Sequence, residues 1–360
     1  MKKLIRLKES RAVRLAASAM AVAAAVAGAT GIVAGQGNAA PATKAENASH
    51  LPNATKFKHP KLKHGVLTIQ GTNAGDGIAL RLQAGQPGIL QVDVGDDGSA
   101  DFSFGRDRIA KIAVDARAGD DLVRIDESNG VFTDSIATTL DGGDGNDNLA
   151  GGSGAELLLG GDGNDSIDGN KGNDLAFLGA GDDTFVWDPG DGSDTVEGQD
   201  GEDTMRFNSA NVAEQVDLSA NGKRLKFFRD VANITMDTAG VERVDFNALG
   251  GADKVTVNDL TGTGVTTVNV DLAGALGGAT GDGQPDRVVV NATNGNDTID
   301  VSGDAEVAKV SGLAATTRVL HSEVANDRLE INTLAGSDTL NTIGLAAGAI
   351  RLFLDGLLVQ

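Results

Sequence analysis

The stretch GGDGNDNLAGGSGAELLLGGDGNDSIDGNKGNDLAFLGAGDDTFV (142–186) divides into five consecutive nonapeptide blocks. Repetition at a fixed short period is the mark of a repeat architecture, in which each unit packs on its neighbours. The sixth position of every block is acidic, and these residues are Asp147, Glu156, Asp165, Asp174 and Asp183. The eighth position is apolar in every block, at Leu149, Leu158, Ile167, Ala176 and Phe185.

This pattern has a mechanical interpretation. Glycine adopts positive φ without strain and lets backbone carbonyls turn inward, while the apolar eighth position begins a short strand that faces a core. Each block then forms half a coil, and two blocks complete one full coil. The expected fold is all-β: a right-handed parallel β-roll or β-helix solenoid, with turns stacked along two edges and apolar residues stacked between them.

The turns of this array are crowded with negative charge. Between Asp141 and Thr204 there are 17 acidic residues and one basic residue, Lys171. Stacking brings the carboxylates within a few ångströms of one another, so their repulsion and the entropy of the many glycines oppose folding. A hard cation with six to eight oxygen ligands suits carboxylates plus carbonyls, which predicts Ca²⁺ rather than Mg²⁺. Zinc is disfavoured because the array has neither Cys nor His.

The blocks resemble the RTX, or hemolysin-type, calcium-binding repeats, whose motif is GGxGxDxUx with U a large apolar residue. The resemblance implies that each ion lies between a turn and the turn stacked on it two blocks later, held by sixth-position carboxylates and carbonyl oxygens. A disordered Gly/Asp-rich linker is the alternative. The implied metal-binding residues are Gly142, Gly145, Asp147, Glu156, Gly160, Gly163, Asp165, Gly169, Gly172, Asp174, Gly181 and Asp183.

The resemblance implies two edges of unequal quality. They are formed by Asp147, Asp165 and Asp183, and by Glu156 and Asp174. The second edge departs from the motif, because Glu156 is one methylene longer, Lys171 adds a cation and the next in-phase position is Gly192. Two well-formed sites are therefore expected on the first edge and a weaker one on the second. Asp165→Asn is predicted to lower calcium affinity more than Asp174→Asn.

Looser copies of the block occur outside the array. VDARAGDDLV (114–123), FNALGGADKV (246–255), VNATNGNDTI (290–299) and INTLAGSDTL (331–340) align with LDGGDGNDNL (140–149). None of these copies has an in-phase neighbour two blocks further on. Because Gly and Asp are common turn formers, these residues are predicted to shape turns between coils, with metal sites as the alternative.

The sequence on both sides of the array alternates as strands do. GVLTIQG (65–71), GIALRLQAG (77–85) and KVTVNDL (254–260) are examples. The predicted organisation is a β-rich segment over 65–140, the calcium-binding array over 141–204 and a β-helical segment over 205–360. Residues 211–229 are less regular, and FFRD (227–230) is predicted to be an edge or capping feature.

Residues 1–42 have the layout of a secretory signal peptide. Basic residues from Lys2 to Arg14 precede an Ala-rich run over 15–35 and small residues up to Ala42. An uncleaved membrane anchor is the alternative. Removing the six basic residues and Glu9 of this segment leaves 24 basic and 50 acidic residues, a net charge of −26. Cations, rather than nucleic acid or an anionic membrane, are then the expected partners.

The predicted location is secreted or extracellular, with attachment to the cell surface left open. An exported chain without cysteine cannot be stabilised by disulfides. The segment 43–64 is expected to be a linker, and a patch for an anionic wall polymer is the alternative. The charged and titratable residues of this segment are Lys44, Glu46, His50, Lys56, Lys58, His59, Lys61, Lys63 and His64.

The sequence bears on three classes of function. A non-catalytic, calcium-stabilised scaffold or surface protein follows directly from the array, and an adhesin with an unidentified cell-surface or matrix partner is its variant. An enzyme is disfavoured because the sequence contains no HExxH, GxSxG or cysteine nucleophile, and His321 is its one histidine beyond the linker. A hydrolase using carboxylates alone stays as the alternative. A pore-former is disfavoured because no long apolar segment follows the signal peptide.

Similarity to bacterial secreted RTX-type proteins extends beyond the blocks. It includes PGDGSDTVEGQDGEDT (189–204) and FNALGGADKVTVNDLTGT (246–263). The resemblance implies the fold and calcium binding there, but no enzymatic role.

Overall fold

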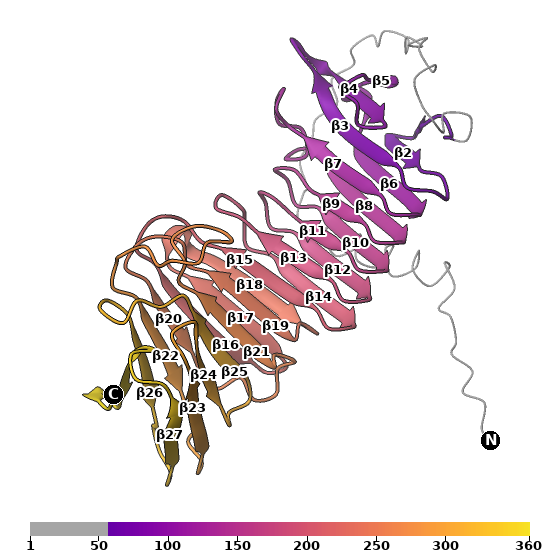
Figure 1. The fold of residues 1–360 in the computed structure, drawn as a ribbon. Coiled ribbons are helices and arrows are strands. Elements are labelled where there is room, and N and C mark those ends of the chain that lie inside the picture. Colours follow the sequence, from indigo (N-terminus) through magenta and orange to yellow (C-terminus); the bar gives the residue numbers. More distant parts are fainter. Residues whose placement is uncertain (1–56) are drawn as a thin grey trace, which may run out of the picture. The chain divides into compact units, whose positions relative to one another are not determined.

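A computed structural model describes residues 57–360, and these residues form an all-β protein. Within this range there is no α-helix, and the helical elements are two short 3-10 turns, η2 (Arg106–Arg108) and η3 (Val231–Asn233). The strands form two long sheets that share one hydrophobic core (Figure 1). The prediction of an all-β solenoid is confirmed at this level.

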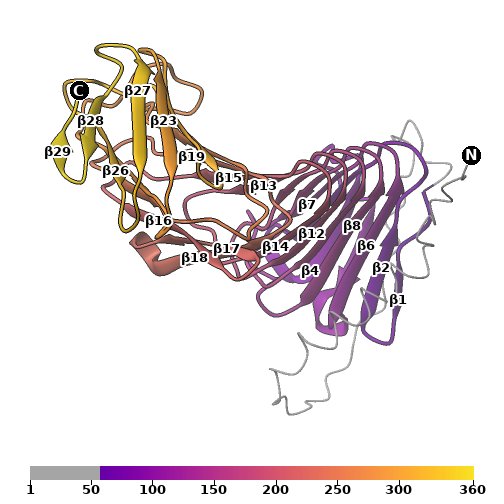
Figure 2. The ribbon, with the colours of Figure 1, turned by 90° about the horizontal axis from the view of Figure 1, so that it is seen from below.

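The first sheet, sheet A, has 15 strands. In spatial order they are β1 (Lys61–Lys63), β2 (Val66–Gln70), β6 (Lys111–Ala118), β8 (Ala137–Asp144), β10 (Leu157–Asp162), β12 (Leu175–Ala180), β14 (Thr195–Asp200), β18 (Ile234–Ala239), β17 (Arg224–Arg229), β16 (Gln215–Asn221), β20 (Lys254–Val257), β22 (Arg287–Asn291), β26 (Arg328–Asn332), β28 (Arg351–Leu354) and β29 (Leu357–Leu358). Figure 2 shows β2, β6 and β8 side by side from below.

The second sheet, sheet B, has 14 strands. In spatial order they are β27 (Thr339–Leu345), β23 (Thr298–Gly303), β24 (Val307–Ser311), β25 (Thr316–Leu320), β21 (Thr267–Asp271), β19 (Arg243–Asn247), β15 (Thr204–Asn208), β13 (Thr184–Trp187), β11 (Ser166–Asp168), β9 (Asn148–Ala150), β7 (Leu122–Asp126), β3 (Gly77–Gln83), β4 (Gln86–Val94) and β5 (Phe102–Gly105).

The coils of the array repeat with a period of two blocks, as the sequence predicts. In sheet A, Leu157 of β10 pairs with Leu175 of β12, and in sheet B, Ser166 of β11 pairs with Thr184 of β13. Both pairings are parallel. Successive blocks therefore contribute alternately to the two sheets, so that every second block stacks on the same edge.

Apolar residues at the eighth position of each block form the core between the sheets. Their side chains are fully buried, and they are Leu149, Leu158, Ile167, Ala176 and Phe185. Side chains alternate between the two faces of a strand, so one buried residue per short strand covers the inner face while its neighbours face outward. The sequence predicts this pattern and the structure confirms it.

Antiparallel hairpins interrupt the parallel stacking outside the array. GILQVDVG (88–95) lies mostly in β4, which pairs antiparallel with β3 instead of forming a further coil. β16 and β17 form another hairpin inside sheet A, between β18 and β20. The prediction for FFRD (227–230) was wrong, because β17 has a strand on each side and Phe227 is fully buried. Its phenylalanine extends the core and does not cap it.

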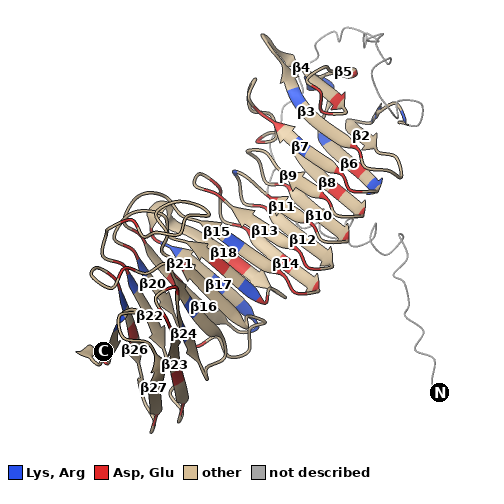
Figure 3. Ribbon diagram, viewed as in Figure 1, with Lys and Arg blue, Asp and Glu red and all other residues tan. Residues whose placement is uncertain are grey.

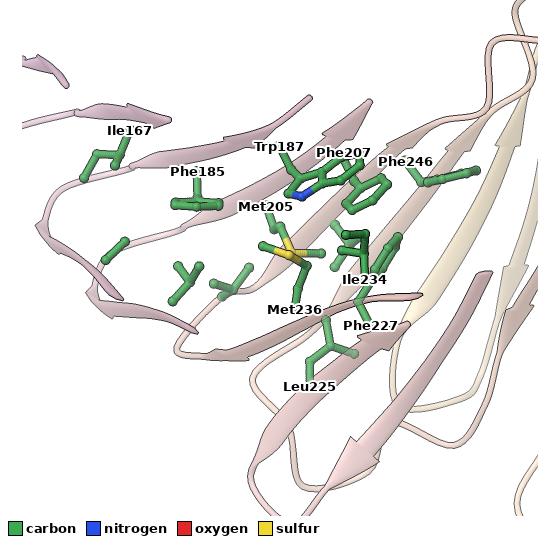
Figure 4. Packing of buried hydrophobic residues seen from close by; sticks show 14 of the residues in the cluster. Ile167, Phe185, Trp187, Met205, Phe207, Leu225, Phe227, Ile234, Met236 and Phe246 are labelled. Carbon is green, nitrogen blue, oxygen red and sulfur yellow. The ribbon is translucent and has the colours of Figure 1, made fainter. Parts of the chain in front are cut away.

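Aromatic residues concentrate where this hairpin meets the array (Figure 4). The rings of Trp187 and Phe207 are stacked with centroids 4.0 Å apart, and Phe227 lies 4.4 Å from Phe207. Stacked aromatic pairs add stability beyond the apolar area that they bury. Trp187 is the single tryptophan of the chain and is buried, so its fluorescence reports on this end of the array.

The signal peptide prediction falls on residues 1–42, outside the described residues, as does most of the predicted linker. Lys61–Lys63 at the end of that segment form β1 and pair with β2. In residues 57–360 no helix has the length and apolar character needed to cross a bilayer.

Candidate metal centres

An acidic residue stands directly before each sheet B strand of the array. Asp147, Asp165 and Asp183 precede β9, β11 and β13 and lie in one column. The backbone N–H of Asp147 donates to Oδ1 of Asp165 at 2.8 Å, and that of Asp165 donates to Oδ1 of Asp183 at 2.7 Å. Each carboxylate thus fastens its own turn to the turn before it. The structure brings the three residues of the predicted first edge together.

The second oxygen of each carboxylate is available for a ligand. It is buried and has no hydrogen-bond partner within residues 57–360 in Asp147, Glu156, Asp165, Asp174 and Asp183. Burying a carboxylate oxygen without a donor is strongly unfavourable, so such groups in native proteins are paired or coordinate metals. This observation fits a cation at these turns.

Glycine keeps space open beside the unpartnered oxygens. A Cβ added to Gly142 would lie 2.3 Å from Oδ2 of Asp147 and 2.8 Å from the carbonyl oxygen of Gly160 in the next coil. A Cβ at Gly160 would likewise lie 2.4 Å from Oδ2 of Asp165. Carboxylate and carbonyl oxygens therefore face the same small space, which any larger residue would fill. These are the hard oxygen ligands that Ca²⁺ prefers.

A second column stands before the sheet A strands β10, β12 and β14. The N–H of Glu156 donates to Oδ1 of Asp174 at 2.7 Å, and the N–H of Asp174 donates to Oδ1 of Asp194 at 2.8 Å. The strict period places Gly192, which has no side chain to contribute, at the next in-phase position after Asp174, and this prediction was wrong. The turn after β13 is two residues longer than the others, so the partner is Asp194.

Because of the same two-residue insertion, the strict nine-residue period also misses one more residue of the first column, Asp203. The N–H of Asp183 donates to Oδ1 of Asp203, 20 residues later, at 3.0 Å. Oδ2 of Asp203 is also buried and unpartnered among the described residues. GDGSD (190–194) and GQDGED (198–203) carry the Gly/Asp signal. A search that allows one insertion between blocks would have found both residues.

Electrostatics disfavours the ionised form of the columns when no cation is bound. Burial raises the pKa of Asp165 to about 7, and the charges of Asp183 and Asp147 add to this rise against the hydrogen bond from the Asp147 backbone. For Asp174, burial and the charges of Asp194 and Glu156 raise the pKa to about 9. Lys171 is exposed and lowers the pKa of Asp191, whose net shift is upward because of burial. Asp and Glu recur in the turns beside β8 to β14, where Lys and Arg are scarce (Figure 3).

Each site would combine few side chains with backbone oxygens. In the described part of the chain, no group of three or more His, Cys, Asp or Glu side chains is arranged to hold a metal ion. Two carboxylates per ion, supplemented by carbonyl oxygens such as that of Gly160, fit this arrangement. A cysteine- or histidine-based metal centre does not.

The looser copies of the block differ from one another. Asp121 continues the first column, since its N–H donates to Oδ1 of Asp147 at 2.8 Å, but the buried Ala116 stands where the array has Gly142. Asp297 accepts hydrogen bonds from the N–H and hydroxyl of Thr293 in its own turn. Its carboxylate closes a turn, as the sequence predicts for these copies.

Comparison with known proteins identifies the array. The family described as RTX calcium-binding nonapeptide repeat (4 copies) matches residues 139–155, 151–185 and 190–211. A search of curated proteins finds no match. The matched ranges include both columns of the array, and the last one includes Asp194 and Asp203. Residues 139–211 of this chain therefore carry RTX repeats, which are calcium-binding motifs and make Ca²⁺ the cofactor of this segment.

Proposed function

We propose that this protein is an exported, non-catalytic scaffold whose central right-handed β-roll is completed by calcium. The observation that carries the proposal is the pair of carboxylate columns, in which one oxygen of each Asp accepts a backbone N–H from the coil before it. A second oxygen is buried without a hydrogen-bond partner among the described residues in Asp147, Glu156, Asp165, Asp174, Asp183 and Asp203. The export step rests on the basic and Ala-rich pattern of residues 1–42. The predicted segments 65–140, 141–204 and 205–360 are its proposed parts.

The proposed ligands are the sequence-predicted residues together with Asp194 and Asp203. Bound calcium supplies positive charge that offsets the repulsion between stacked carboxylates. The Asp side chains hold adjacent turns in register through the backbone N–H that each one accepts. Glycines at the first positions keep the carbonyl and carboxylate oxygens exposed to one small space. Folding and ion binding are then one process, because the ligands are assembled only when two coils stack.

Affinity sets where the array folds. Extracellular calcium modules bind with dissociation constants of about 10⁻⁴ to 10⁻³ M. With affinities in that range, the array stays unfolded at cytosolic calcium and folds after export. The segment would then act as an extracellular scaffold, whose partner is calcium and whose surface is free for other molecules.

Calcium titration of the full chain tests the proposal. We expect circular dichroism to show a gain of β signal, and Trp187 fluorescence to change in parallel, because its indole N–H donates to the carbonyl of Gly192 at 2.8 Å, two residues before Asp194. Calorimetry gives the stoichiometry. A matched titration with Mg²⁺ is the control, and we expect little response to it. The same melting curve in EDTA and in millimolar Ca²⁺ would refute the proposal.

A further inference from the structure

Two basic residues stand directly opposite each other on the outer face of sheet B, outside the matched repeats. Lys309 of β24 pairs with Arg318 of β25 in antiparallel register. Their strand neighbours Val310 and Val319 are buried in the core, so the two basic side chains share the outer face. Directly opposite residues have Cβ atoms about 4.5–5.5 Å apart, and like charges placed there are destabilising. An anion between the two side chains would remove this repulsion.

Neither of these charges has a partner in the described part of the chain, where no hydrogen bond, ion pair or ring contact involves Lys309 or Arg318. Arg318 is partly buried. Within residues 57–360 every other partly buried arginine has a partner, as Arg287 has in Glu330. A partly buried charge without a partner loses hydration that nothing replaces. The absence of a carboxylate partner stands out in a chain with a formal net charge of −21.

A hollow of about 560 Å³ lies over this basic pair, and both cations line it. Three residues with hydroxyl groups also line it. Ser302 of β23 stands opposite Lys309, and Thr267 of β21 pairs with Thr316 of β25. None of the three hydroxyl groups has a hydrogen-bond partner among the described residues. The volume of the hollow is in the range of small-molecule sites, and its lining offers positive charge together with free hydroxyl groups.

The acids around the hollow are engaged elsewhere. Asp304, which lines the hollow, lies in the turn between β23 and β24. Its Oδ1 accepts the N–H groups of Glu306 and Val307, at 3.0 Å and 3.2 Å, so this carboxylate closes its own turn. Asp245 of β19, two strands away from β25, forms an ion pair with Arg243. Neither acid supplies the negative charge that the basic pair lacks.

We infer that the hollow binds a small phosphorylated sugar, with its phosphate between Lys309 and Arg318. A guanidinium offers two parallel N–H groups to a phosphate, and an ammonium adds a point charge. The two positive charges match the charge of about −1.5 to −2 on a phosphate monoester at pH 7 better than the single charge of a carboxylate. The free hydroxyl groups of Ser302, Thr267 and Thr316 suit the hydroxyl groups of the sugar. A long polyanion fits less well, because the acidic chain as a whole repels it.

Calorimetric titration of the full chain with glucose 6-phosphate, in saturating calcium, tests the inference. We expect saturable binding by the unaltered chain and at least about a tenfold loss of affinity in both Arg318→Gln and Lys309→Gln. Arg206→Gln is the matched control, because Arg206 is exposed on the outer face of the same sheet but stands opposite an acid, Asp245. We expect no change for that variant. Equal affinity in all four proteins, or no binding by the unaltered chain, overturns the inference.

Inorganic phosphate and heparin distinguish the possible sources of the anion. Inorganic phosphate should bind more weakly than glucose 6-phosphate, because it has no sugar hydroxyl groups to contact the threonines and serine. Heparin, a sulfated polymer, should also bind more weakly, because the acidic chain repels it. Binding of either compound that is as tight as that of glucose 6-phosphate, or tighter, overturns the assignment to a small phosphorylated sugar.

A measurement on the unaltered chain covers the case in which a variant does not fold, which melting curves in calcium detect. Crystals of the unaltered chain soaked in tungstate, a tetrahedral dianion, are expected to give an anomalous peak between Lys309 and Arg318. A map without a peak there overturns the inference. The calcium titrations that test the proposed function are separate from this outcome, because the basic pair lies outside both carboxylate columns.

Discussion

In the array and in the C-terminal coils alike, a turn aspartate accepts a backbone N–H from the coil before it, as Asp165 does from Asp147 and Asp286 does from Asp253. The two regions differ in how they balance the negative charge of these carboxylates. In the array a coil consists of two nonapeptides, and its carboxylates face glycines and carbonyl oxygens. In the C-terminal part the step from β22 to β26 is 41 residues, as between Asn291 and Asn332. There Arg287 donates to Glu330, and the side chains of Asn258, Asn291 and Asn332 hydrogen-bond in a row.

The comparison indicates that the shorter coils depend more strongly on a bound cation than the longer coils do. The coils of two nonapeptides carry a single basic residue, the exposed Lys171, so most of the balancing positive charge must come from solution. A longer coil carries its own arginines and amides, which satisfy many of the polar groups that folding buries. We therefore expect calcium to control the array and to have a smaller effect on the C-terminal coils.

Removal of calcium is expected to have the largest effect. For each site saturated at 100 times its dissociation constant, EDTA removes about 2.7 kcal/mol of stability. Hydrogen exchange followed by mass spectrometry should show loss of protection in β9 to β13, with protection largely retained in β19 to β22. A uniform loss along the chain would remove the distinction between the two regions.

Gly161→Ala is expected to be among the most damaging single substitutions in the array. Gly161 has φ of +130°, and an added Cβ would lie 1.9 Å from the carbonyl oxygen of Gly143. Strain and overlap together should lower stability by roughly 2–5 kcal/mol. Gly222→Ala is the control, because Gly222 has φ of +65° with no atom within 4 Å of the added Cβ. We expect it to lose about 1 kcal/mol, and denaturant melts in calcium measure both. Equal losses would show that close stacking of the turns does not limit stability.

Asp165→Asn and Asp174→Asn should lower calcium affinity to a similar degree. The sequence alone predicted a smaller effect for Asp174, but the structure gives it an in-phase partner, Asp194, on the far side from Glu156. Each substitution removes a charged ligand, so we expect at least about a tenfold loss at the affected sites. Calorimetric calcium titrations of both variants measure whether the two losses of affinity are similar. A loss of affinity confined to Asp165→Asn would support the sequence prediction that the first edge binds calcium better than the second.

Lower pH should stabilise the calcium-free array. Burial raises the folded-state pKa of Asp165 to about 7 and that of Asp174 to about 9, well above the ordinary carboxyl value. The folded form therefore binds more protons than the unfolded form, and stability falls as pH rises through the folded pKa values. In EDTA the melting temperature should be higher at pH 5 than at pH 8. In calcium the dependence should weaken or reverse, because protons compete with the ion for the same oxygens.

Asn291→Ala should have the smallest effect on calcium dependence. It breaks the amide row of the C-terminal coils, in which Asn291 donates to Asn258 at 2.7 Å and accepts from Asn332 at 2.8 Å. Loss of the two hydrogen bonds should lower stability by about 1–3 kcal/mol. Melting curves with and without calcium should show the same loss. A loss that appears only in EDTA would mean that the two regions are energetically coupled.

The sequence predicts the coils of the array because the nine-residue period, the turn glycines and the apolar core residue can be recognised in each block. Leu149 and Phe185 are buried in the expected register for this reason. Asp194 and Asp203 were missed because two extra residues in the turn after β13 shift the period without changing the turn chemistry. The hairpin of β16 and β17 was missed because Phe227 is recognisable as core only once its neighbours Phe207 and Phe246 are known.

The hydrogen bonds along the columns all run the same way. The N–H of Asp147 is accepted by the later Asp165, and the N–H of Asp165 by the later Asp183. The stack is therefore polar, like a filament with distinct ends. If the chain crossed a membrane amino end first, each coil could form this bond only after the next coil had emerged. If the carboxyl end crossed first, each newly emerged coil could form the bond at once. The direction of one repeated bond would thus set the order in which the coils close during any vectorial transport.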